Sequence, residues 1–113
     1  MDSILTSVKK MLGITAEYTH FDADIIMHIN SVFMILNQLG VGPSECFSIE
    51  GSDETWDEFI KDDFNIEAVK SYMFLKVSLM FDPPTSTNVL EAKTRLSDEL
   101  EWRLNASTYN KIE

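Results

Sequence analysis

The stretch that decides the fold is "EAVKSYMFLKVSLMFDPPTS", residues 67–86. Ten of its first fifteen residues are apolar or aromatic, and we expect them to form a helix over residues 67–81 that Pro83 and Pro84 stop. At about 100° per residue these side chains do not keep to one side of the helix. A helix that is apolar nearly all round is buried nearly all round. The rest of the chain must therefore cover this helix on several faces.

Three further helices are predicted around it, over residues 3–12, 22–39 and 87–104. Lys9 and Lys10 fall in the last turn of the first, where positive charge favours the helix dipole. Asp22 is placed to cap the second helix. Gly40 is placed to end it, with Val41 completing a Schellman motif. The predicted core-facing stripes of the second and last helices are Ile25, Ile29, Val32, Phe33, Leu36 and Leu39, and Val89, Ala92, Leu96, Leu100 and Leu104.

A long insertion separates the second helix from the apolar helix. "ETWDEFI", residues 54–60, predicts a short helix, and residues 47–49 are candidates for an extended piece. Residues 45–67 carry nine acids against Lys61 alone. The predicted fold class is thus all-α, a small bundle of four to five helices with a long acidic loop and short helix inserted between the second and fourth.

The composition fits one globular domain over residues 1–113. An apolar content of 44% in 113 residues is ordinary for such a domain. We expect its core at about 3–104 and a flexible tail at 105–113, "NASTYNKIE". No apolar run reaches eighteen residues and "MDSILTSVKKMLGI" does not resemble a signal peptide, so no membrane association is expected. Cys46, without a partner cysteine, favours synthesis in a reducing cytoplasm.

The net charge of −10 argues against nucleic-acid binding through phosphate neutralisation. The acids of the insertion are open to two interpretations: a solvated loop, or a surface that repels DNA or meets a basic partner. The candidate DNA-repelling residues are Asp53, Glu54, Asp57, Glu58, Asp62 and Asp63.

More apolar side chains are present than the predicted core needs. The candidates for an oligomer or partner interface are Met27, Met34, Phe47, Trp56, Phe59, Phe74, Trp102 and Tyr109. The two methionines are either incidental or a contact strip, and Trp102 either lies over its own helix end or anchors a partner. Such a surplus predicts self-association, by one dimer contact or by a head-to-tail contact between two different patches that closes a ring.

The sequence contains no catalytic constellation. It has no phosphate loop, dinucleotide glycine pattern or nucleophile elbow. His20, Asp24 and His28 recur every four residues, but His20 precedes the helix and His28 lies beside its core stripe, which favours structural histidines over metal ligands. We therefore expect no enzyme activity, cofactor or metal.

The order of these parts resembles the small head–tail connector proteins, also called adaptor or head-completion proteins, of long-tailed bacteriophages and prophages. The similarity covers residues 1–104 and is carried by "VKKMLGI", "HFDADIIMHINSVFMILNQLGVGP", "TWDEFIKDD", "KVSLMFDPPTS" and "LSDELEWRLN". The last two phrases are the most specific.

The resemblance implies a non-enzymatic structural protein at the virion head–tail junction. Such proteins form a ring beneath the portal, here expected to be dodecameric like the portal, let DNA pass, and dock the next completion protein or the tail. An acidic channel wall would avoid adhesion to phosphate. The alternatives are an acidic phage-encoded inhibitor that mimics DNA, or a helical adaptor unrelated to virions.

Overall fold

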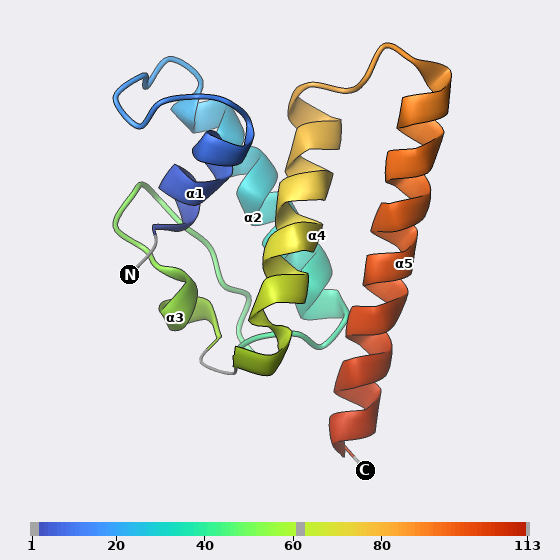
Figure 1. The fold of residues 1–113 in the computed structure, drawn as a ribbon. Helices are drawn as coiled ribbons and strands as arrows, with labels where there is room; N and C mark the ends of the chain where they lie inside the picture. The colour runs from blue at the N-terminus through green and yellow to red at the C-terminus, as the bar shows by residue number, and fades with distance from the viewer. Residues whose placement is uncertain (1–2, 61–62, 113) are drawn as a thin grey trace.

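The protein folds as an all-α bundle, as the sequence predicts. The computed structural model describes the backbone of residues 3–60 and 63–112 and the side chains of residues 3–60 and 66–106. Its helices are α1 (Ile4–Met11), α2 (Asp22–Gln38), α3 (Trp56–Phe59), α4 (Asp63–Phe81) and α5 (Thr87–Ile112). Along Figure 1, α2 and α4 run in opposite directions, as do α4 and α5. The molecule measures 44 × 36 × 19 Å, so its thinnest dimension corresponds to about two helix diameters of ~10 Å.

Helix α4 is the centre of the bundle, and other helices cover most of its apolar surface. It packs against α1, α2 and α5. Val69, Tyr72, Met73 and Val77 are completely buried. Phe74 and Leu75, on another side of α4, are only half-buried. The chain therefore covers α4 on most sides and leaves one flank partly open.

Two glycines end the first two helices by the same mechanism. Gly40 has φ +82°, its N–H donates to the carbonyl of Asn37 at 3.0 Å, and the N–H of Val41 donates to Leu36 at 2.9 Å. These bonds form the predicted Schellman motif. Gly13, with φ +80°, closes α1 in the same way.

The start of α2 differs from the prediction that Asp22 caps it. Phe21 occupies the capping position without a side-chain hydrogen bond, and Asp22 is the first helical residue. The Asp22 carboxylate instead forms an ion pair with Lys9 at 2.8 Å. This long-range pair takes the carboxylate away from the backbone N–H groups that it was expected to bind.

The last helix is longer than predicted and turned about its axis. Instead of ending near residue 104, α5 continues to Ile112 and extends past the other helices at its C-terminal end (Figure 1). Ser97 and Leu104 are buried, at 1% and 2% exposure, whereas Leu96 of the expected stripe is 49% exposed. Because Ser97 rather than Leu96 lies on the buried side of α5, Leu96 is left exposed.

The insertion packs back onto the bundle. Asn30 of α2 accepts from the N–H of Ile49 (2.8 Å) and donates to its carbonyl (3.0 Å). The amide thereby replaces the strand partner that residues 47–49 lack, and these residues form no strand. An isolated antiparallel bridge joins Ser3 to Thr55, and the Ile4 N–H donates to the backbone carbonyl of Glu54 at 3.0 Å.

Candidate assembly surfaces

An apolar groove lies along the open flank of α4. Its volume is about 350 Å³. Leu96 and Leu100 of α5 line it, whereas Ser97 between them in sequence is buried. Met11 at the end of α1 is 62% exposed and also borders it. The lining residues are Met11, Ser71, Phe74, Leu75, Ser78, Lys93, Leu96 and Leu100.

A second apolar surface lies on the exposed side of α2. Met27 and Met34 are 58% and 56% exposed and stand two turns apart, with Ser31 between them. The Ser31 hydroxyl donates to the Met27 carbonyl at 3.0 Å, so it does not reach outward for a partner. We call Asp24, Met27, Ser31 and Met34 the α2 strip; all four are exposed.

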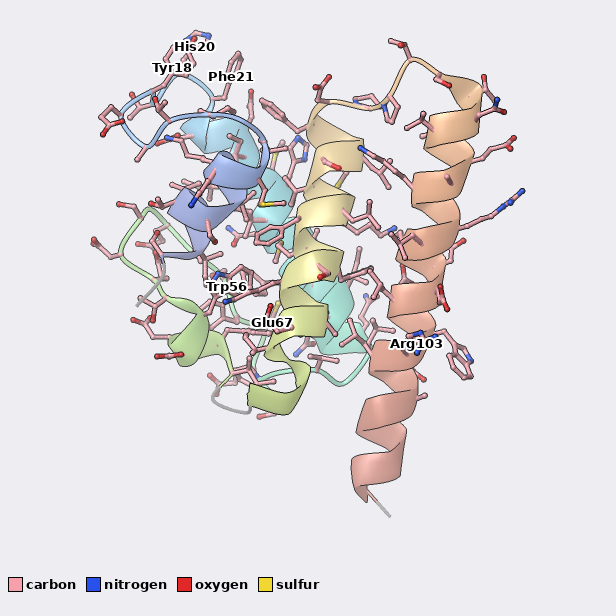
Figure 2. The ribbon with its side chains drawn as sticks, viewed as in Figure 1. Tyr18, His20, Phe21, Trp56, Glu67 and Arg103 are labelled. Carbon is pink, nitrogen blue, oxygen red and sulfur yellow. The ribbon has the colours of Figure 1, made fainter. Side chains whose placement is uncertain are left out.

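Trp102 is the most exposed large apolar residue of the described chain, at 70%. It lies six residues from Leu96 along α5, about 120° around the helix. Its neighbour Arg103, labelled in Figure 2, pairs with Glu99 at 2.9 Å, and Trp102 is not among the residues that line the groove. Trp102 therefore does not belong to the groove.

Three aromatic residues that were expected at an oligomer or partner interface instead pack within the protein's own core. Trp56 and Phe59 are 3% and 4% exposed, and Phe47 is half-buried. Phe33 of α2 lies 5.0 Å from Phe47 and 4.7 Å from Phe59, centroid to centroid. This corrects the expectation that these side chains are free for a partner: the insertion folds over α2 and covers them.

Trp56 also links the insertion to the N-terminal helix. Its indole N–H donates to the Ser7 hydroxyl at 3.0 Å, and its ring lies 6.3 Å from that of Phe74. Figure 2 places Trp56 between α1 and α3, beside α4. Of the interface candidates, Phe74 lies in the groove, and the side chain of Tyr109 is outside the described residues.

The acidic residues lie on the outer side of the insertion. Asp53, Asp57 and Glu58 are exposed. Glu54 accepts from the backbone N–H groups of Glu50 (2.8 Å) and Gly51 (3.4 Å). Partial burial acts to raise the pKa of Glu54, but these hydrogen bonds outweigh it and hold the pKa below its usual value. Glu54 is therefore a turn-stabilising residue; Asp62 and the side chain of Asp63 lie outside the described residues.

Lys9 has a role that the sequence analysis missed. It is only 2% exposed, and its ammonium contacts the Asp22 carboxylate as well as the carbonyls of Ala16 (3.1 Å) and Tyr18 (2.7 Å). One buried cation thus fixes the loop between α1 and α2, which carries Tyr18, His20 and Phe21 at one end of the bundle (Figure 2). The available signal was its position four residues after Leu5, on the buried face of α1.

Both histidines of the described chain lie beside aromatic rings. His20 packs edge-on against Phe21 at 4.7 Å and His28 lies 6.4 Å from Phe81, so both histidines contact aromatic rings. Within residues 3–60 and 66–106, no three His, Cys, Asp or Glu side chains gather closely enough to hold a metal ion. In the described chain, no helix combines the length and apolarity that crossing a membrane requires.

Comparison with known proteins identifies the family. A family profile described as "Phage connector protein" matches residues 4–111, nearly the whole chain. No curated protein and no solved structure matches significantly. The chain therefore belongs to the phage connector protein family, whose members have a structural role at the phage head–tail junction.

Proposed function

We propose that this connector assembles as a ring beneath the portal, lets DNA pass, and docks the next completion protein or the tail. The observation that carries the proposal is that two apolar surfaces, the groove and the α2 strip, stay exposed on different elements after the core has formed. Large exposed apolar patches on small proteins typically mark interaction sites.

The placement of these surfaces favours a ring over a simple dimer. A two-fold dimer uses the same patch on both subunits, whereas a head-to-tail contact uses two different patches and can close into a ring. The groove lies between α4 and α5 with Met11 at its border, and the strip lies on α2. A portal above the ring would set its subunit number, which we propose to be twelve.

The charge distribution supports the passage of DNA. The net charge is −10, and the exposed acids Asp53, Asp57 and Glu58 lie on the outer side of the insertion. A channel wall of this charge would repel phosphate and keep DNA from adhering. The rival function, a DNA mimic, needs carboxylates spread over a surface, and the engagement of Glu54 within its own turn leaves fewer of them for that purpose.

Imaging the protein with its portal tests the proposal. We expect purified connector to be small in light scattering and to form a ring of the portal's symmetry when the portal of the same phage is added. Particle images should show added density on one end of the portal. If the portal gains neither mass nor density at saturating connector, the proposed ring is wrong.

A further inference from the structure

We propose that the α2 strip of one subunit occupies the α1–α4–α5 groove of the next, with Asp24 against Lys93. The inference rests on the proposed ring and specifies its subunit contact. The groove has two walls, α4 and α5, with Met11 bordering it, and a third helix can lie between two others if it presents a narrow apolar ridge. The α2 strip is such a ridge.

The spacing of the two surfaces matches. Along α5 the groove residues are Lys93, Leu96 and Leu100, separated by three and four residues. Along the strip Asp24, Met27 and Ser31 are separated by the same intervals. At 1.5 Å per residue both sets extend about 10 Å, so all three positions can be in register at once.

This register places compatible side chains opposite one another. Met27 falls against Leu96, which is 49% exposed in the free subunit. Ser31 falls at the level of Leu100, and Ser71 of the antiparallel α4 lines the same groove; small residues there allow close helix approach. Met34 continues the ridge toward the end of the groove, and its flexible thioether suits an irregular apolar surface.

Charge fixes the direction of the strip. Lys93 lines the groove, and neither Lys93 nor Asp24 forms an ion pair with another described residue. Placing Asp24 at Lys93 aligns α2 of one subunit parallel to α5 of the next. The reverse direction would leave Lys93 without the acid and bring Asp24 to the apolar end at Leu100. Paired charges at the edge of an apolar contact determine register and orientation more than affinity.

The contact uses different patches on the two partners, so it is heterologous. Each subunit offers one strip and one groove, and head-to-tail contacts of this kind form a ring when the rotation between subunits closes. Trp102 lies on another side of α5 and stays free in this contact, available to the proteins above or below the ring.

Cysteine trapping tests the contact even where it is weak. In a Cys46→Ser background, Met27→Cys protein is mixed with Leu96→Cys protein of different mass and oxidised gently. We expect the mixed disulfide dimer to exceed both homodimers by several-fold. The matched control is Met27→Cys with Trp102→Cys, a similarly exposed pair from the same two helices, which should give only background cross-linking.

Charge reversal supplies the second arm. Asp24→Lys in the Met27→Cys protein, or Lys93→Asp in the Leu96→Cys protein, should each reduce the yield of the mixed disulfide several-fold. With both reversals present, one on each partner, the yield should be restored. A dominant Met27→Cys homodimer would overturn the inference in favour of a two-fold α2 contact, and a yield no higher than the Trp102 control would overturn it outright. If wild-type connector still forms rings on the portal in either case, the proposed function stands and this contact alone is wrong.

Discussion

The ammonium of Lys9 and the carboxylate of Asp22 lie 2.8 Å apart, and the lysine is almost fully buried. The pair joins the end of α1 to the start of α2, and two loop carbonyls complete the coordination of the ammonium. A cation buried in this way has exchanged its water shell for fixed oxygens, so its removal leaves the carboxylate and carbonyls without their partner.

Lys9→Ala should lower the free energy of unfolding by about 2–4 kcal/mol. The value lies slightly below that for breaking a fully buried pair because the Asp22 side chain keeps 24% exposure and can be rehydrated. Urea unfolding followed by circular dichroism measures it. Lys10→Ala is the control: Lys10 is exposed, and its change should stay within about 0.5 kcal/mol. Equal effects of the two substitutions would contradict a structural role for Lys9.

Gly42→Ala should destabilise the protein by about 1–3 kcal/mol. Gly42 has φ +89°, and a Cβ there would meet the Phe59 ring at 2.5 Å, so strain and a steric clash add together. Gly13→Ala meets nothing within 4 Å at φ +80°, and should cost only the backbone strain, about 1 kcal/mol.

Thermal melting of the glycine variants checks this order. Gly51→Ala, which meets open space, completes the series and should be nearly neutral. A Gly42 variant as stable as the Gly51 variant would show that Phe59 does not pack against the 41–43 turn.

Tyr72→Phe should cost about 1–2 kcal/mol at neutral pH. The buried Tyr72 hydroxyl donates to the Glu101 carboxylate at 2.9 Å, and Lys76 lies 3.5 Å from the same oxygen, which limits the loss. Tyr18→Phe, at an exposed tyrosine, is the matched control and should be neutral.

The same hydroxyl makes stability depend on alkaline pH. Burial raises the pKa of Tyr72, and the hydrogen bond and charge of Glu101 raise it further. In the unfolded chain the phenol titrates near about pH 10. Above that pH the unfolded state loses a proton that the folded state retains. The contribution of Tyr72 to the free energy of unfolding is therefore fully present below about pH 10 and falls as the pH rises beyond it. Urea midpoints of wild type and Tyr72→Phe should therefore converge between neutral and strongly alkaline pH; a constant difference would contradict the assignment.

The two tryptophans should respond oppositely. Trp56→Ala removes a buried indole and its bond to Ser7, and should cost about 3–5 kcal/mol. Trp102→Ala removes a side chain that is 70% exposed and should leave the melting temperature nearly unchanged while weakening assembly on the portal. Calorimetry and light scattering with portal separate these effects. A Trp102 variant that unfolds readily would place its ring in the core.

The sequence predicted the centre of the fold better than its edges. The all-round apolarity of residues 67–81 correctly required burial on several sides, and the glycine signals at Gly13 and Gly40 correctly ended two helices. The end of α5 was missed because polar residues after Leu104 resemble a tail, although no glycine or proline interrupts residues 105–112.

The candidate surfaces were predicted only in part. Met27, Met34 and Trp102 are exposed as expected, because each lies off the stripe of a long helix. Trp56 and Phe59 were misplaced because a helical wheel describes one element, whereas their burial depends on how the insertion crosses α2. Lys9 and Asn30 were missed for the same reason: their partners lie in loops that periodicity does not describe.

Because the molecule is only 19 Å thick, its melting temperature depends on the proteins that bind it. In a molecule two helices thick, each layer has one side that faces solvent. The outer sides of the helices therefore stay exposed to water until another protein covers them. Any partner that binds only the folded form raises the melting temperature, by an amount that grows with the logarithm of the partner concentration relative to its Kd. A subunit seated in the particle should therefore survive temperatures at which the free subunit unfolds, so that assembly also protects the folded connector from heat.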